Sequence, residues 1–109
     1  MLISAYMTGL CKEMEKLGKG IGNANRYRML EAMMKGQKTV GEIAMEVRLT
    51  QPNVSQNLKI LKSANLVSSK RKGREVYYSI NVAYMMGVLK GLAGKISACK
   101  KKTRGLKNC

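Results

Sequence analysis

Residues 39–80 read TVGEIAMEVRLTQPNVSQNLKILKSANLVSSKRKGREVYYSI. The stretch holds two short helical patterns and, directly after them, a basic hairpin pattern. Thr39 and Glu42 have the Thr-x-x-Glu spacing of a capping box, which predicts the start of the first helix. Apolar side chains then follow at helical spacing and predict the buried face of this helix, which is Val40, Ile43, Ala44 and Val47.

The second helix is predicted to follow after a tight turn. Thr50 is its expected N-cap, and Pro52 falls in the first turn, where a backbone N–H is not needed. Two helices joined in this way predict a helix-turn-helix over residues 39–64. In that motif the start of the second helix meets base edges in the major groove of DNA. The candidate base-reading residues are polar side chains at this start, namely Gln51, Asn53, Ser55, Gln56 and Asn57.

Residues 66–80 predict a β-hairpin, or wing, beside the helix-turn-helix. Its strands are expected over 66–71 and 75–80, and Gly73 in the intervening turn can take a positive φ. Basic side chains crowd the tip, and others lie further along the preceding helix. We expect them to hold DNA phosphates. These candidates are Lys59, Lys62, Lys70, Arg71, Lys72 and Arg74.

The charge of the chain supports a polyanionic partner. Its 109 residues include 21 Lys and Arg but only 6 Asp and Glu, so the net charge is +15. Residues 1–54 carry 8 basic and 5 acidic side chains, whereas residues 55–109 carry 13 basic side chains and only Glu75 as an acid. A merely solubilising surface would not need such clustering. Histidine is absent, which removes the commonest general base and zinc ligand, and we do not expect an enzyme.

Helices are predicted on both sides of this central stretch. Residues 2–17 have one apolar face (Ile3, Tyr6, Leu10, Met14 and Leu17), after which Gly18, Gly20 and Gly22 are expected to break the helix. A second helix is expected from Asn23 or Asn25 to Lys35, with Tyr27, Leu30, Met33 and Met34 buried. The last helix is predicted to begin near Asn81, with an apolar face made of Val82, Met85, Met86, Leu89, Leu92, Ala93 and Ile96.

The last helix also contains Gly87, Gly91 and Gly94. Small residues allow another helix to approach closely, which favours a dimer seam; simply tolerated glycines are the alternative. The length predicts a single domain, residues 1–99, followed by a basic flexible tail, residues 100–109. No apolar run reaches the roughly 18–20 residues of a membrane span, so we expect no membrane partner. Three scattered cysteines favour the cytoplasm over an oxidising compartment.

Four segments together resemble the ArsR/SmtB family of winged helix-turn-helix repressors. They are residues 25–30 (NRYRML), 39–44 (TVGEIA), 50–58 (TQPNVSQNL) and 73–78 (GREVYY). The resemblance covers about residues 20–82. It implies a mainly α fold with a small β-hairpin (α+β): four helices, two strands and a fifth helix, with dimerisation through the first and last helices. It also implies a repressor that binds an imperfect inverted repeat in double-stranded DNA. Asn57 departs from the family pattern, in which His is common.

Members of this family often release DNA when a metal, a metalloid or a sulfur oxidant binds. Residues 40–47 contain no cysteine, and neither does the second helix, so the family's usual sites are not matched here. The candidate thiol sensor is therefore Cys11, Cys99 and Cys109. Two thiols could form a disulfide, and three could bind As(III), although the sequence assigns no metal site. The alternatives are incidental cysteines and a member of the family without small-molecule sensing.

A different class of function also fits the charge. A non-specific architectural module, or an RNA-binding one, would use the basic surface alone. Few aromatic side chains are available for base stacking beyond Tyr77, Tyr78 and Tyr84, which argues against single-stranded nucleic acid. Sequence-specific binding to duplex DNA is therefore the leading hypothesis.

Overall fold

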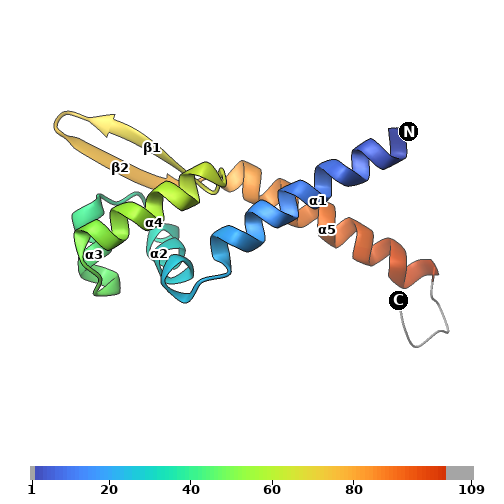
Figure 1. Ribbon diagram of the computed structural model, residues 1–109, viewed down its shortest axis with the longest axis horizontal. Coiled ribbons are helices and arrows are strands. Elements are labelled where there is room, and N and C mark those ends of the chain that lie inside the picture. Colours follow the sequence, from blue (N-terminus) through green and yellow to red (C-terminus); the bar gives the residue numbers. More distant parts are fainter. Residues whose placement is uncertain (1, 103–109) are drawn as a thin grey trace.

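The structure is a computed structural model that describes the backbone of residues 2–102 and the side chains of residues 9–99. In Figure 1, a head made of α2, α3, α4 and the hairpin lies at one end, and α1 and α5 cross at the other. The fold is mainly α with a small β-hairpin, as predicted. The elements are α1 (Leu2–Ile21), α2 (Ala24–Met34), α3 (Val40–Val47), α4 (Gln51–Ser63), β1 (Val67–Lys72), β2 (Glu75–Ile80) and α5 (Val82–Lys102).

The core of the head lies between α2, α3 and α4. The expected apolar face of α4 is confirmed, because Val54, Leu58 and Leu61 are buried. On α3, Ile43, Ala44 and Val47 are buried as expected, whereas Val40 is only half-buried. The face expected for α2 was partly wrong. Tyr27 is 45% exposed and Met34 60% exposed, whereas Met29 and Ala32 are buried. The physical reason is that α2 packs against both α3 and α4, so it buries a different and wider stripe than a helix with one neighbour.

Local capping interactions set the ends of these helices. The Asn23 side chain accepts a hydrogen bond from Arg26 N at 3.1 Å and starts α2. Thr39 and Glu42 complete both halves of the predicted capping box of α3. Arg48 then adopts a left-handed conformation with φ 58°, which turns the chain sharply between α3 and α4. Thr50 caps α4 by accepting from Asn53 N at 3.3 Å.

The first helix does not end where its glycines suggested. α1 continues through Gly18 and Gly20 to Ile21, so the predicted break was misplaced. Gly20 is buried, and a Cβ there would overlap Cδ1 of Leu66. This glycine therefore permits close packing of α1 on the head rather than breaking the helix. At the end of α1, Gly22 N donates a hydrogen bond to the Gly18 carbonyl at 2.7 Å. The side chains of Ile3 and Tyr6, which we expected on the apolar face, lie outside the described residues.

The wing is a two-stranded antiparallel hairpin with a register from Val67↔Ile80 to Lys72↔Glu75. The register leaves a two-residue loop, Gly73-Arg74, one residue shorter than expected. Gly73 has φ 63°, and a positive φ at the first loop position is typical of a type II′ turn. At the other end, Lys38 and Tyr78 exchange two backbone hydrogen bonds of 3.0 and 2.8 Å, which tie β2 to the segment before α3.

Asn81 joins the head to α5. Its backbone N–H donates to the Leu66 carbonyl at 2.9 Å, and its side-chain amide donates to the Asn65 carbonyl at 3.1 Å. Its side-chain oxygen also accepts from Tyr84 N at 3.4 Å in the first turn of α5. One residue therefore fixes the direction in which α5 leaves the head.

The outer part of α5 carries apolar side chains that the described chain leaves uncovered. Val88 is buried, whereas Val82, Met86, Leu89 and Ile96 are exposed. A Cβ at Gly91 would lie 3.3 Å from Leu10 Cδ1, so this glycine marks the crossing with α1 within one chain. α5 extends to Lys102, into the region expected to be a flexible tail, and residues 103–109 lie outside the described part. Within that part, no helix is long and apolar enough to cross a membrane.

Candidate nucleic-acid interface

α4 presents its polar residues on the side opposite its buried face. Val54 and Leu58 anchor the helix in the core. Gln51, Asn53 and Gln56 are exposed, whereas Ser55 and Asn57 are half-buried. The candidate base-reading residues therefore lie together on and beside the free surface at the amino end of α4.

Gln51 leans toward the start of α3. Its side-chain nitrogen lies 3.6 Å from the position that a Cβ of Gly41 would take. This is an ordinary van der Waals separation, so the Gln51 amide lies directly beside the start of α3.

Asn53 and Asn57 form a hydrogen-bonded pair one turn apart. Nδ2 of Asn57 donates to Oδ1 of Asn53 at 2.6 Å and to the Asn53 carbonyl at 3.0 Å. Oδ1 of Asn57 accepts from Nη1 of Arg26 at 3.2 Å. Arg26 lies in α2 and also donates to two carbonyls at the end of α1, from Nε to Gly20 at 2.7 Å and from Nη2 to Lys19 at 2.8 Å. Both functional groups of the Asn57 amide are thus occupied within the protein.

The two candidate phosphate-binding lysines of α4 differ in their surroundings. Both are exposed. Lys62 Nζ donates to Ser69 Oγ at 2.7 Å, which links the end of α4 to β1. No hydrogen bond from the Lys59 side chain is found among the described residues, and Lys59 extends from the exposed side of the helix. Lys62 therefore connects α4 to the wing and keeps further N–H donors for a ligand, and Lys59 is available to a ligand.

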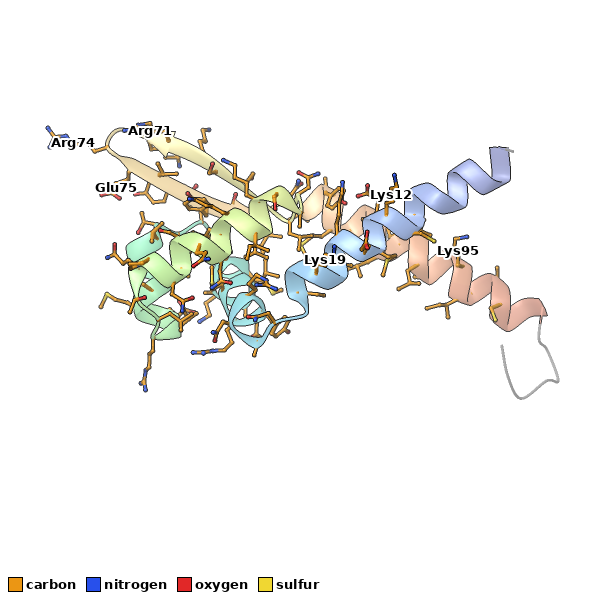
Figure 2. The ribbon with its side chains drawn as sticks, viewed as in Figure 1. Lys12, Lys19, Arg71, Arg74, Glu75 and Lys95 are labelled. Atoms are coloured by element: carbon orange, nitrogen blue, oxygen red, sulfur yellow. The ribbon has the colours of Figure 1, made fainter. Side chains whose placement is uncertain are left out.

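The wing carries cations on both faces and at its tip. Figure 2 shows Arg71 and Arg74 at the far end of the hairpin, with Glu75 beside them. Side chains alternate along a strand, so Lys70 and Lys72 share one face of the hairpin and Arg71 lies on the other. Lys72 Nζ lies 5.5 Å from the centre of the Tyr77 ring, a cation–π distance that supports the lysine.

These cations are not neutralised by acidic side chains. Across the described side chains, the ion pairs lie within α1 and between the α2–α3 region and Glu46, and none involves a basic residue of α4 or the wing. Closely spaced unpaired cations repel one another, and a phosphate backbone relieves that repulsion. The charge of this surface therefore suits a nucleic-acid duplex.

A separate cluster of charges holds α3 in place on the far side of the head. Lys35 Nζ lies 2.7 Å from Glu46 Oε2, and Lys38 Nζ lies 3.8 Å from Oε1 of the same carboxylate. The hydrogen bond from Lys35 lowers the pKa of Glu46 and raises the pKa of Lys35. Arg28 adds a hydrogen bond of 2.6 Å to the Val47 carbonyl at the end of α3.

The candidate thiols are distributed over α1, α5 and the end of the chain. Cys11 is an exposed free thiol, and it lines a groove of about 340 Å³ with Leu10, Met14, Leu92 and Lys95. Cys99 is half-buried and is not a free thiol. It lies about 12 Å along α5 beyond the crossing at Gly91, at 1.5 Å per residue. Cys109 lies outside the described residues. Among those described, no group of three or more His, Cys, Asp or Glu could hold a metal ion.

Sequence reasoning missed the contact between Arg26 and Asn57. Position 26 lies within the family-like segment 25–30, but its contact with Asn57 spans 31 positions of the chain. Periodicity and capping patterns act over a few residues, so they carry no signal for such a contact.

Known bacterial regulatory proteins resemble this chain in sequence. The chain matches the family described as "Bacterial regulatory protein, arsR family" over residues 23–69, from the N-cap of α2 into β1. It is similar to the transcriptional repressor SdpR of Bacillus subtilis (strain 168), with 35% identity over 72 residues that cover 66% of this chain and 80% of the repressor. These relatives are named as regulators and not as enzymes, in agreement with the expectation from the missing histidine.

Solved structures share the fold. One is the homodimeric winged helix-turn-helix DNA-binding domain (fragment 1–100) of a possible ArsR-family transcriptional regulator from Mycobacterium bovis. Its TM-score is 0.67 at 28% identity, and the match covers 82% of this chain and 85% of that one. NolR from Sinorhizobium fredii matches with a TM-score of 0.66 at 28% identity, over 82% of this chain and 89% of that one. The predicted winged helix-turn-helix is thereby confirmed.

Proposed function

Because this chain belongs to the arsR family of bacterial regulatory proteins, we propose that it is a sequence-specific transcriptional repressor that binds operator DNA as a homodimer. One observation carries the proposal. The amino end of α4 exposes Gln51, Asn53 and Gln56 next to a wing whose cations have no acidic partner among the described side chains. A cytoplasmic location is where such a protein would meet DNA.

The two parts of this surface have different tasks. α4 enters the major groove, where Gln51, Asn53, Ser55 and Gln56 lie nearest the base edges. The wing follows the backbone, and cations on both of its faces suit a ribbon that straddles a groove. The phosphate contacts come from Lys59, Lys62, Lys70, Arg71, Lys72 and Arg74.

The homodimer explains the apolar side chains exposed on α5. Met86, Leu89 and Ile96 would be covered by the same helix of a second copy, and α1 would complete the interface. A two-fold axis through that interface places two heads on one face of the DNA. The operator is then an imperfect inverted repeat, with half-sites separated by about one turn of the double helix or a multiple of it.

Release of DNA through cysteine chemistry is the regulation that this chain can offer. Cys11 is exposed and lies in the α1–α5 region, where dimer geometry is set. An oxidant or As(III) is expected to lower operator affinity in the wild type, and Cys11→Ser is expected to abolish that response. If neither reagent changed the operator affinity of the wild type, the protein would be a repressor that senses no small molecule.

Two alanine variants test the division of tasks. Arg71→Ala is expected to weaken binding to every duplex and to reduce the slope of log affinity against log salt by about one. Gln56→Ala is expected to relax preference at one base pair and to leave the salt slope unchanged. Affinities would be measured on a selected duplex and its single-base variants across a salt series. If neither variant differed from the wild type, the proposed interface would be incorrect.

A non-specific architectural module is the competing function, and charge alone favours it. It predicts equal affinity for an inverted-repeat duplex and for random duplex of the same length. The proposed repressor predicts preference for the repeat by a factor of roughly 10³ or more at physiological salt. A competition experiment between the two duplexes separates these functions.

A further inference from the structure

We propose that Arg26 is a positioning residue that determines which end of the Asn53 amide faces DNA. Acting through Asn57, it turns Asn53 so that its N–H donors point outward, and Asn53 then selects a hydrogen-bond acceptor on the DNA base it meets. The inference rests on the proposed DNA-reading function of α4 and adds a specificity-determining mechanism to it.

The guanidinium of Arg26 is held firmly. It donates to the Gly20 carbonyl at 2.7 Å and to the Lys19 carbonyl at 2.8 Å, both at the end of α1. Carbonyls in the last turn of a helix have no partner within that helix, so Arg26 satisfies two groups that would otherwise lack one. The remaining nitrogen, Nη1, is thereby aimed at α4, where it meets Asn57 Oδ1 at 3.2 Å.

The donors of Arg26 determine the orientation of the Asn57 amide, which in turn determines the orientation of the Asn53 amide. A guanidinium has donors only, so the Asn57 atom facing it must be the oxygen. Nδ2 of Asn57 consequently faces Asn53, where it donates to the carbonyl at 3.0 Å and to Oδ1 at 2.6 Å. A donor facing Asn53 requires an oxygen there as well. The Asn53 side-chain oxygen is therefore turned inward, and its nitrogen is left on the exposed side.

This orientation restricts what Asn53 can recognise. An asparagine with both ends free can bond adenine in a bidentate manner. Here the outward group is a donor, which suits the N7 and O6 acceptors of guanine, N7 of adenine or O4 of thymine. It does not suit the amino group of cytosine. Gln51 and Gln56 have no such restraint among the described residues, so they remain free to present either end.

Replacing Asn57 with aspartate should reverse the orientation. Aspartate has nearly the same shape, and one of its oxygens would still accept from Arg26. The other oxygen would lose the bond that Nδ2 of Asn57 makes to the Asn53 carbonyl and would shift toward the Asn53 side chain, which would turn its N–H group inward to donate to it. The oxygen of Asn53 would then point outward, toward base donors. Asn57→Asp adds a negative charge, which lowers affinity for all duplexes, but only the reversal changes the preferred base.

The experiment measures base preference. A duplex would be selected from a randomised pool with the wild-type protein, and affinities for all of its single-base variants would be measured for the wild type, Asn53→Ala and Asn57→Asp. Asn53→Ala identifies the base pair that Asn53 reads. At that pair, Asn57→Asp is expected to change the ratio of affinities for acceptor and donor bases by roughly tenfold. The double variant Asn53→Ala/Asn57→Asp, which retains the added charge, should show no such change.

A measurement on the free protein tests the relay without DNA. The Nδ2 protons of Asn57 are expected to exchange with solvent more slowly than the side-chain amide protons of Gln56, and Arg26→Lys should remove that difference. Equal exchange rates in the wild type, or a base preference unaltered in folded Asn57→Asp, would overturn this inference alone. A wild type without any preferred duplex would instead overturn the proposed function.

Discussion

At the scale of single residues, Gly20 sets how closely α1 approaches the head. A Cβ at this position would overlap Leu66, which is itself completely buried. Gly20→Ala is therefore expected to destabilise the protein by about 1–3 kcal/mol, the usual cost of overpacking a core. Chemical denaturation followed by circular dichroism measures the free energy of unfolding.

Gly18 provides the matched control in the same helix. A Cβ at Gly18 meets nothing within 4 Å, and the position is exposed. Gly18→Ala is expected to stabilise the protein by roughly 0.5–1 kcal/mol, because alanine loses less backbone entropy than glycine in a helix. If the two substitutions changed the free energy of unfolding equally, the contact with Leu66 would not be the cause of the change in Gly20→Ala.

Residue-level prediction worked where the chemistry is local. Asn23, Thr39, Glu42 and Thr50 cap helices as their sequence patterns indicated, because a cap bonds to groups two or three positions away. Asn57 was expected to read bases directly, yet its amide is engaged by Arg26 and Asn53. Its surroundings depend on packing between distant helices, which no local pattern records.

At the scale of elements, one carboxylate connects α3 to the end of α2. Glu46 accepts from Lys35, and this hydrogen bond lowers the pKa of Glu46. A lowered pKa in the folded state means that the contribution to stability is present above about pH 4.5, the ordinary glutamate value. It is lost as the pH falls through the folded-state value. The raised pKa of Lys35 likewise means that its contribution is present below pH 10.5 and lost above that range.

The variant Glu46→Gln tests this linkage. The wild type is expected to melt slightly above Glu46→Gln at pH 7, and the two melting temperatures should converge as the pH falls below 4.5 and through the lowered pKa of Glu46. The difference should be small, since the Lys35 ammonium is exposed. Glu75→Gln, which removes an exposed acid of β2 whose side chain forms no ion pair or hydrogen bond among the described residues, is the charge-matched control. A pH-independent difference between wild type and Glu46→Gln would argue against the ion pair as its cause.

Elements were predictable to different extents. Amphipathic period and caps defined α3 and α4, whose buried faces came out as expected except at the half-buried Val40. α1 was predicted too short, because Gly18 and Gly20 were interpreted as helix breakers. The buried face of α2 was also partly wrong, since a single sequence does not reveal how many neighbours a helix has. Element type follows from local pattern, whereas ends and faces depend on packing.

At the scale of the whole molecule, the protein is elongated, with extents of 55 × 30 × 20 Å. Figure 1 shows α1 and α5 projecting away from the head. This shape exposes Met86 and Leu89, which a second copy would cover. Met86→Lys is expected to weaken self-association at least tenfold, because a charge would replace apolar surface at the interface. Sedimentation velocity over a range of concentrations measures the effect.

Met45→Lys is the matched control, since Met45 is 84% exposed on α3, away from α5. It should associate like the wild type. If Met86→Lys and Leu89→Lys both associated like the wild type, the dimer would have to use another surface.

The contacts of Asn81 influence the angle between the head and α5. Asn81 bonds the head through Leu66 and Asn65 and caps α5, so it anchors the base of that helix, which is held further along by the buried Val88 and by the crossing with α1 at Gly91. A helix of 21 residues is about 31 Å long, so a tilt of about 10° at its base displaces the far end by about 5 Å. In a dimer such a tilt would change the distance between the two α4 helices, so that they no longer match successive major grooves. Substitutions at Asn65 or Asn81, which are not among the proposed DNA-contacting residues, would then alter which operator spacing is tolerated.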